Sequence, residues 1–377
     1  MKLLIAGDYC DRYRVSSSIE RGDYQILFNQ ITPIVESCDY SIVNFEFPVV
    51  VDHECPIPKC GPNLKGQKKA IDAIRYAGFN VCTLANNHIL DQGEKCCLNT
   101  KQLLEKDGIK TVGAGFNTED ASKILYLRTD DITVAVINCC EHEFSIASEG
   151  SAGANPLNPI SQYYQIKEAK NRADYVIIIV HGGHEHYQLP SPRMQETYRF
   201  FVEAGVDVVV NHHQHCYSGY ELYKNKPIFY GLGNFLFDDP HKRNSIWNEG
   251  FLLELIFEKE RGINFQLHPY SQCNESVGVF LMKSEYKEKF NKKINELNSI
   301  ISSPEKLKQC HDQMMEDTYK EYELIFQPIR SRITDALFRR KLFPSVLSNS
   351  QKLLLYNFIA CESHVERLLD AVRRYKK

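Results

Sequence analysis

The sequence predicts an α/β fold with buried central strands, followed by a helical C-terminal region. Short apolar runs recur up to about residue 280 with helix-like segments between them, which is typical of βαβ units. One run, ADYVIIIVHGG (173–183), is β-branched and apolar throughout, as expected for a strand buried on both faces. From Lys283 onward the chain is rich in Lys, Glu and Leu, has helical periodicity and contains almost no glycine.

The elements follow in chain order. A helix over 93–108 is predicted to end at Gly108, and a helix over 191–205 has proline near its start and glycine at its end. An amphipathic stretch over 66–77 precedes the third strand. The predicted strands are 2–7, 39–49, 78–88, 132–140, 173–183, 206–213 and 226–237, with 251–260 and 262–271 as a β-hairpin.

Length and composition predict one large domain with an appendage. The 377 residues exceed the commonest domain size, and we place the α/β domain at 1–280 and the helical region at 281–377. Breaks between the C-terminal helices are expected near Ser303-Pro304 and Phe343-Pro344-Ser345. The net charge of −3 gives no indication of general nucleic-acid binding.

Cysteine use and hydropathy predict a cytoplasmic protein. The 13 cysteines are odd in number, irregularly spaced and without a CxxC pattern, which favours a reducing compartment over a disulfide framework or a zinc ribbon. The first apolar stretch has five residues from Leu3 and ends at Asp8, too short for a signal peptide or a membrane span. No later run reaches about 18 apolar residues, so we expect no transmembrane helix.

Polar residues with ligand chemistry stand where the apolar runs stop. Strand ends at the carboxyl edge of an open α/β sheet converge on one crevice, so five strands are predicted to deliver these side chains to one place. Carboxylate, amide and imidazole together suit Mn, Fe or Zn better than Mg or Ca. The residues are Asp8, Glu46, Asn86, Asn87, His88, His181, His213 and His215.

Each of these residues also has a simpler interpretation. Asp8 alone is compatible with a helix cap or a turn, and Glu46 with a solvent-facing strand position. The segment 84–93 is compatible with a plain turn, because asparagine favours caps and the left-handed region. The joint occurrence of all of them at strand ends favours a metal site. His184 and His186 lie near the proposed site without an assigned role.

The same residues resemble the motifs of the CapA family of poly-γ-glutamate capsule proteins. The matching segments occur in the family's order and extend over about residues 1–275. That family in turn resembles the calcineurin-like metallophosphoesterases. The resemblance implies a four-layer αββα metallophosphoesterase-like sandwich that binds one or two divalent metal ions. The segments are GD (7–8), NFEFP (44–48), ANNHILDQG (85–93), HGGHEH (181–186) and NHHQHCYSGYELYKNKPIFYGLGNFLFD (211–238).

The resemblance also implies roles for individual residues. Asp8 and His215 take the positions of first-metal ligands, and Glu46 that of the bridging carboxylate. The second metal is expected to be held by Asn87, His181 and His213. Further roles are a proton donor to the leaving group (His88), a carboxylate that orients it (Asp91), a ligand, outer partner or substrate contact (Glu185), and a residue that shapes the floor of the site (Asn234).

The chain departs from the family pattern at several positions. Phosphoesterases carry a histidine where this chain has Cys10, which is compatible with a soft-metal ligand or with a buried thiol; we favour the buried thiol. Asn211 replaces a usual glycine and Gln214 a common proline, and neither change removes a ligand. CapA relatives are often membrane-anchored outside the cell, and we expect no such anchor here, which argues against a direct role in capsule export.

The sequence therefore predicts a metal-dependent hydrolase that acts on a phosphoester or a γ-glutamyl-type amide of an anionic small molecule or polymer. The alternative is a non-catalytic metal-binding assembly partner in polymer synthesis; a site that binds a phosphorylated intermediate is a third option. Lys65, Lys68, Lys69 and Arg193 are anion contacts or a solvated face. The C-terminal helices are open to four interpretations, namely a cap on the site, a homodimer interface, a surface that recruits a partner or a helical cap on exposed core; we favour the last.

Overall fold

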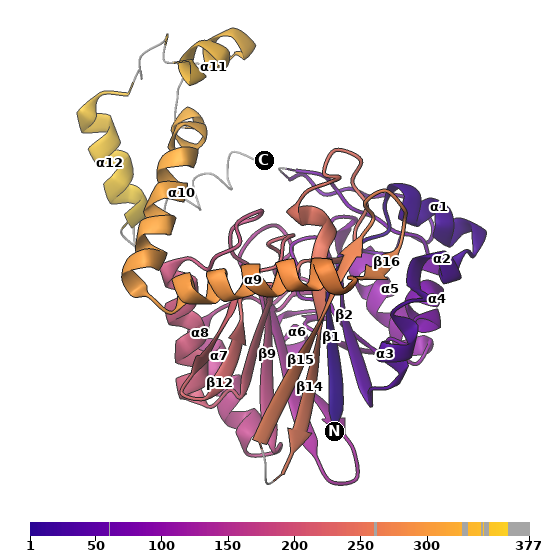
Figure 1. Ribbon diagram of the computed structural model, residues 1–377. Helices are drawn as coiled ribbons and strands as arrows, with labels where there is room; N and C mark the ends of the chain where they lie inside the picture. The colour runs from indigo at the N-terminus through magenta and orange to yellow at the C-terminus, as the bar shows by residue number, and fades with distance from the viewer. Residues whose placement is uncertain (60, 260–261, 326–330, 341, 343–346, 361–377) are drawn as a thin grey trace. The chain divides into compact units, whose positions relative to one another are not determined.

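Two mixed β-sheets lie face to face at the centre of the protein, with helices outside each (Figure 1). The computed structural model describes residues 1–59, 61–259, 262–325, 331–340, 342 and 347–360. The chain divides into two compact units, Met1–Leu307 and Lys308–Lys377. The first unit contains both sheets, and the predicted α/β fold of four layers with C-terminal helices is confirmed.

The first sheet is built around a parallel core. Strands β1 to β4 pair in sequence order and run parallel, so their carboxyl ends lie along one edge. Strands β14 and β15 form the predicted antiparallel hairpin, and β14 pairs with β1, so that the hairpin extends the sheet beyond β1. The order is β16 (Val279–Leu281), β15 (Gly262–Gln272), β14 (Glu249–Glu258), β1 (Lys2–Tyr9), β2 (Tyr40–Phe45), β3 (Val81–Thr83) and β4 (Lys110–Val112), with β13 (Asn234–Leu236) also paired to β1.

The second sheet is also built around parallel strands. Its four central strands, β7, β9, β10 and β12, are parallel, and the two outer strands run antiparallel to them. The order is β11 (Tyr220–Tyr223), β12 (Lys226–Phe229), β10 (Val208–His212), β9 (Tyr175–His181), β7 (Thr133–Cys140) and β6 (Leu125–Arg128). A separate small pair joins β5 (Ala114–Gly115) to β8 (Gly153–Ala154).

Aromatic side chains fill the space between the two sheets. The Phe229 and Phe265 rings lie 5.1 Å apart and those of Tyr175 and Phe257 5.0 Å apart, each pair joining a strand of one sheet to a strand of the other. Burying these large rings supplies much of the hydrophobic contact that holds the sheets together.

Helices cover the outer faces. On the first sheet's side the amphipathic segments bury one apolar face in a continuous cluster; these helices are α1 (Tyr13–Arg21), α2 (Tyr24–Phe28), α3 (Thr32–Glu36), α4 (Lys69–Tyr76) and α5 (Gly93–Lys106). On the second sheet's side lie α7 (Pro159–Lys170) and α8 (Pro192–Ala204). Helix α8 starts and ends as predicted, because Ser191 caps it and Gly205 has a positive φ of 126°. The short helices α6 (Thr118–Ala121) and η1 (Ile246–Asn248) lie in connections.

One predicted strand is wrong. The run 226–237 forms two strands in different sheets, β12 in the second sheet and β13 in the first, rather than one. The chain turns between them at Gly233, whose φ is 81°, so the apolar run breaks there. A Cβ on Gly7 would lie 1.8 Å from the carbonyl oxygen of Gly233, so only glycine lets β13 approach β1 this closely.

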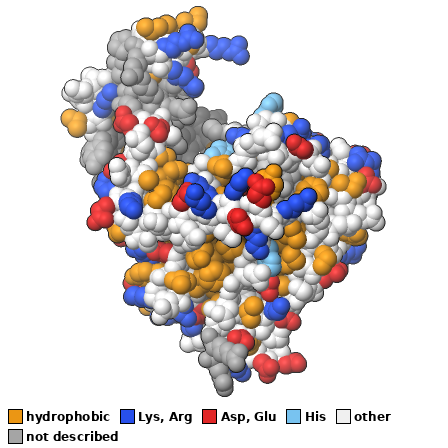
Figure 2. Space-filling view, in the orientation of Figure 1, with side chains coloured by type: hydrophobic (Ala, Val, Ile, Leu, Met, Phe, Trp, Pro, Cys, Tyr) orange, Lys and Arg blue, Asp and Glu red, His pale blue; other side chains and the backbone are white. Residues whose placement is uncertain are grey.

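The C-terminal region is helical where it is described. Helix α9 (Ser284–Ile301) buries Phe290, Ile294 and Leu297 and contacts β11, while its Lys and Glu residues face outward (Figure 2). The predicted break at Ser303-Pro304 is confirmed by the start of α10 (Pro304–Ile325). Helices α11 (Arg332–Arg339) and α12 (Asn349–Ala360) follow. The break predicted at 343–345 lies outside the described residues.

The domain boundary predicted at residue 280 stays a prediction, with α9 inside the first compact unit. Among the described residues, no helix combines the length and the apolarity needed to cross a bilayer.

Candidate metal centre

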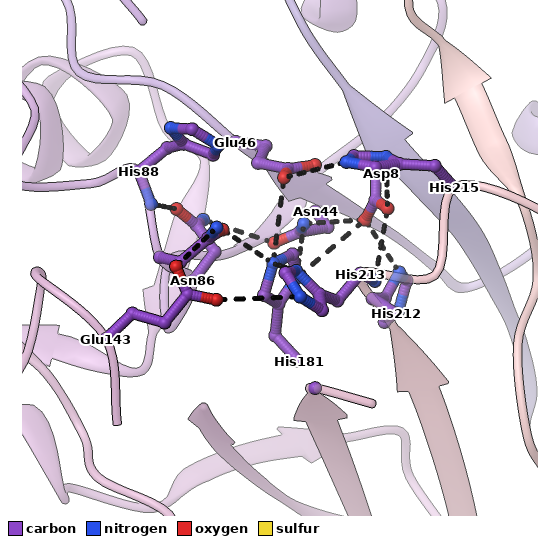
Figure 3. A network of polar contacts seen from close by, with 12 residues as sticks. Asp8, Asn44, Glu46, Asn86, His88, Glu143, His181, His212, His213 and His215 are labelled. Carbon is purple, nitrogen blue, oxygen red and sulfur yellow. Dashed lines mark hydrogen bonds and ion pairs between the residues drawn. The ribbon is translucent and has the colours of Figure 1, made fainter. Parts of the chain in front are cut away.

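The carboxyl ends of the two sheets meet and bring side chains from distant parts of the chain together (Figure 3). Asp8 at the end of β1 is in register with Asn44 on β2 and with Asn234 on β13. His181 ends β9 opposite His212, which ends β10. The Asn44 amide joins the two sheets, because its Nδ2 lies 2.7 Å from Asp8 Oδ1 and 3.2 Å from His181 Nδ1.

Glu46 occupies the centre of the cluster and is fully buried. Neither of its carboxylate oxygens has a hydrogen-bond partner in the described part of the chain. Its Oε1 lies 3.6 Å from His181 Nε2 and 4.0 Å from His215 Nε2. A buried carboxylate without a donor is costly, so this arrangement calls for a cation.

Four atoms that could bind a metal lie close together, and one of them is Glu46 Oε1. His181 Nε2 lies 3.0 Å from Asn87 Oδ1, 3.1 Å from His213 Nδ1 and 3.6 Å from Glu46 Oε1. Ligand atoms that lie about 2.0–2.2 Å from a metal ion are themselves about 3.0–3.5 Å apart in tetrahedral or octahedral geometry. The spacing therefore fits the coordination shell of one ion, and Glu46, His181 and His213 form one of two groups able to hold it.

The second group consists of Asp8, Glu46 and His215, so Glu46 is shared by both. Asp8 Oδ2 lies 3.7 Å from His215 Nδ1. The other partner of that nitrogen is Asn234 Oδ1 at 2.8 Å, which leaves His215 Nε2 toward Glu46. A carboxylate shared by two neighbouring ligand groups could bridge two adjacent metal ions.

The electrostatics of the cluster follow from burial. Burial raises the pKa of Glu46 well above its usual range, and the Asp8 charge adds to this. Burial opposes ionisation of Asp8 as well, but His212, His181 and His215 hold the pKa of that carboxyl well below its ordinary value. Burial, reinforced by His213, lowers the pKa of His181 well below its usual range. Neutral imidazoles are the form that binds metal.

The backbone is unusual at His213 and His215, the two possible ligands that lie furthest along the chain. His213 has a φ of 89° and His215 a φ of 54°, values that residues other than glycine rarely adopt. Such conformations persist where the surrounding structure imposes them, and they cluster at functional sites. Here the His213 amide donates to Asp8 Oδ2 at 3.2 Å, which ties this turn to β1.

A second polar group lies beside the ligand cluster. His88 Nδ1 lies 2.5 Å from Asp91 Oδ2, and the Asp91 carboxylate also accepts the Leu64 amide at 2.6 Å. Because the carboxylate only accepts, His88 Nδ1 carries the proton and Nε2 remains for exchange with another group. Burial lowers the pKa of His88, and the contact with Asp91 opposes this shift.

The remaining predicted residues lie around the cluster. Cys10 is fully buried in the apolar core and belongs to neither ligand group of the described residues; burial, with Glu46 next, raises its pKa well above its usual range. Glu185 is half-exposed, 3.9 Å from His186 Nε2. Lys65 pairs with Glu54 and Arg193 with Glu141, both on the surface.

Sequence reasoning missed four residues of this region. Glu143 Oε2 lies 3.2 Å from Asn87 Nδ2, and Glu143 Oε1 lies 3.6 Å from His213 Nε2. His212 Nδ1 lies 3.3 Å from Asp8 Oδ1. The strand-end rule would have found both, because Glu143 follows β7 and His212 ends β10. Asn44 stands in the NFEFP segment (44–48) without an assigned role, and the sequence gives no indication for Lys59, because it stands in an irregular segment.

The fold and the cluster define a class of protein, a two-sheet α/β protein with a carboxylate–histidine centre at the joined strand ends. Residues 2–239 match the model of the family described as bacterial capsule synthesis protein PGA_cap. The chain belongs to this family.

Related proteins agree with this membership. The chain is 32% identical over 246 residues to the capsule biosynthesis protein CapA of Bacillus anthracis, which covers 63% of this chain and 60% of that protein. It is 28% identical over 286 residues to the PGA biosynthesis protein CapA of Bacillus subtilis (strain 168), with 75% and 74% covered. The matched part therefore spans about three fifths of the first relative and three quarters of the second.

Solved structures show more distant similarity. A hypothetical protein from Thermus thermophilus has a TM-score of 0.47 at 12% identity, over 72% of this chain and 99% of that one. A phosphatase from Mycoplasma pneumoniae has a TM-score of 0.43 at 12% identity, over 77% and 98%. At these values neither similarity bears on function.

Proposed function

We propose that this protein is a metal-dependent hydrolase that acts on a phosphoester or a γ-glutamyl-type amide in the synthesis of a capsule or another cell-surface polymer. The observation that carries the proposal is Glu46, a buried carboxylate without a hydrogen-bond donor in the described residues, shared by two groups of possible metal ligands. Membership of the capsule synthesis family supports the polymer context.

The residues present fit one or two divalent ions. Asp8, Glu46 and His215 would hold one, and Glu46, His181 and His213 the other, with Asn87 adding an amide oxygen. Nitrogen and oxygen donors of this kind favour Mn, Fe or Zn. When bound, such an ion lowers the pKa of a coordinated water toward about 7 and stabilises negative charge on a substrate oxygen.

The residues of this chain that would act as a general acid–base pair are His88 and Asp91. The 2.5 Å contact to Asp91 keeps one proton on His88 Nδ1, so Nε2 is the nitrogen that would take up a second proton and, from the imidazolium form, pass it to a leaving group. A phosphoester releases an alkoxide and an amide releases an amine, and both need this proton. The same residues therefore serve either substrate.

The test is a hydrolysis screen with purified full-length protein. Phosphomonoesters, phosphodiesters and γ-glutamyl peptides are each offered with Mn²⁺, Fe²⁺ or Zn²⁺, before and after chelation. Hydrolysis that depends on metal and falls by about 10²–10⁴ in His88→Asn supports the proposal. A matched control is His268→Asn, which changes a histidine that contacts Glu254 on the β14–β15 hairpin and should keep full activity.

The outcome also separates the rival function. If wild-type protein binds metal and hydrolyses none of these substrates, the hydrolase proposal fails and a non-catalytic assembly role is favoured. The His88–Asp91 pair argues for the enzyme, since a scaffold does not need a positioned proton donor.

A cytoplasmic location is part of the proposal. Eleven cysteines, all of those in the described residues, are free, and eight of them are buried thiols. Unpaired thiols in this number suit a reducing compartment. Fractionation of cells that express the tagged protein tests this, and recovery only from the exterior would contradict it.

A further inference from the structure

The described residues of the segment 50–64, namely 50–59 and 61–64, form an irregular excursion from the first sheet after β2, beside His88. Its base is closed by a bridge between Val49 and Gly66 and by the Val50 amide, which donates to the Gly66 carbonyl at 3.0 Å. A Cβ on Gly66 would lie 2.1 Å from the Phe47 ring, so this closure requires glycine. Most of the described residues of the segment are exposed to solvent.

Lys59 has a buried side chain, unlike the exposed charged residues Asp52 and Glu54 of this segment. Its side chain is only 2% exposed, and Nζ lies 2.6 Å from Asp91 Oδ1, on a carboxylate that is itself fully buried. Nζ also lies 3.2 Å from His88 Nδ1. A buried ammonium needs a counter-charge, and Asp91 supplies it.

The Asp91 carboxylate is thereby held at both oxygens. Oδ1 accepts from Lys59, while Oδ2 accepts from the Leu64 amide and contacts His88 Nδ1 at 2.5 Å. Two of these three partners belong to the segment 50–64. The orientation of Asp91 toward His88 thus depends on this segment being in place.

Neighbouring backbone contacts tie the same segment to the turn that carries Asp91. The Ile57 amide donates to the Asp91 carbonyl at 3.1 Å, and the Cys55 amide donates to Gln92 Oε1 at 2.9 Å. An exposed ion pair, Lys95 with Asp52 at 3.0 Å, joins the segment to the start of α5, the helix that follows this turn. The Lys95–Asp52 pair serves as a comparison for the buried Lys59–Asp91 pair, because exposed ion pairs contribute little to stability.

We infer that Lys59 is a positioning residue: its buried ion pair with Asp91 locks the segment 50–64 over the turn 88–92 and fixes the Asp91 carboxylate toward His88. Within the described part of the chain, no hydrogen bond or ion pair joins Lys59 to the two groups of possible metal ligands. Its effect on turnover rests on the proposed hydrolase function, whereas its effect on the segment does not.

The first test needs no substrate. Hydrogen exchange by mass spectrometry on the full chain is compared for wild type, Lys59→Met and Lys95→Met. Amides of 50–64 should exchange at least about tenfold faster in Lys59→Met, because the local opening is less costly, and at the wild-type rate in Lys95→Met. Equal exchange in wild type and Lys59→Met would overturn the inference.

A double variant keeps the inference testable if a single variant folds poorly. Lys59→Met leaves Asp91 without its counter-ion, and Asp91→Asn leaves the ammonium buried alone, so each should lower the urea midpoint. The double variant Lys59→Met, Asp91→Asn should unfold at a higher urea concentration than either single variant. A decrease in the urea midpoint of the double variant equal to the sum of the decreases in the two single variants would show that the residues do not act as a pair.

The kinetic test separates positioning from substrate binding. Lys59→Met should lower kcat per bound metal with KM unchanged, and Lys59→Arg should restore part of it. A raised KM with kcat unchanged would show that Lys59 contacts substrate instead, and would overturn the positioning role. If wild type shows no hydrolysis at all, the proposed function fails while the exchange and urea results still decide the ion pair.

Discussion

Two buried glutamates in this protein have histidine neighbours, and they differ in how their charge is satisfied. Glu254 on β14 accepts a bond from His268 Nε2 at 2.8 Å, and its other oxygen lies 3.3 Å from the Lys2 ammonium. Glu46 has histidine nitrogens at 3.6 and 4.0 Å and no hydrogen-bond donor in the described residues. Glu254 therefore belongs to an ion-pair cluster in which both of its oxygens have a partner. Glu46 belongs to a group of possible metal ligands in which neither of its oxygens has a hydrogen-bond partner among the described residues.

The pKa directions express the same difference. Burial opposes ionisation of Glu254, but His268 and Lys2 keep the pKa of that carboxyl below its usual value. Burial and the Asp8 charge raise the pKa of Glu46 well above its usual value. A histidine near a buried carboxylate therefore does not indicate a metal by itself. The indication comes from the missing donor and from spacing that suits a shared ion.

The largest expected effect comes from Glu46→Gln. Removing the shared carboxylate should weaken binding of Mn²⁺ or Zn²⁺ by more than the roughly 10–100-fold that loss of an outer partner costs. Competition titration with a fluorescent chelator measures this. Glu254→Gln is the matched control and should bind metal as wild type does. Equal affinity in wild type and Glu46→Gln would contradict the assignment of Glu46 as a ligand.

A smaller effect is expected from Asn234→Ala. Asn234 Oδ1 holds His215 Nδ1 at 2.8 Å, so its loss should leave the ring free to turn and weaken metal binding by about 10–100-fold. Asn248→Ala removes a neighbouring buried amide that bonds backbone carbonyls of 272–273, and it serves as the control. The same titration applies. Equal loss in both variants would point to a general structural effect rather than to His215.

The smallest effect concerns the ion-pair cluster of Glu254. Because the pKa of Glu254 is lowered in the folded protein, its carboxylate stabilises the fold above the unfolded pKa of about 4.3. That contribution is lost as the pH falls through the folded pKa. Glu254→Gln should therefore lower the free energy of unfolding by about 1 kcal/mol or less at pH 7, with a smaller difference at pH 3. Urea titrations at both pH values measure this, and a difference that grows toward pH 3 would contradict the sign.

Much of the fold and of the cluster was predictable from strand ends. The strands β1, β2, β9 and β10 are formed by apolar runs of the sequence. Each ends at or next to a carboxylate or histidine that could bind a metal. Because parallel strands share an edge, chain position was enough to bring Asp8 and Glu46 together in the first sheet. His181 ends a strand of the second sheet, so its approach to them depends on how the two sheets pack.

Other features depend on contacts that lie far apart in the sequence. The run 226–237 gave no sign that β13 changes sheets, since that follows from the close approach of Gly7 to Gly233. Lys59 stands among exposed residues, and its burial depends on how the segment 50–64 folds back on Asp91. Periodicity and composition carry no information about either contact.

Metal content tests the central claim most directly. Protein purified without a histidine tag, and the double variant His213→Ala, His215→Ala, are analysed by inductively coupled plasma mass spectrometry. We expect one or two equivalents of Mn, Fe or Zn per wild-type chain and loss of this metal in the variant. Wild-type protein that holds no metal, even after incubation with each of these ions, would contradict the account.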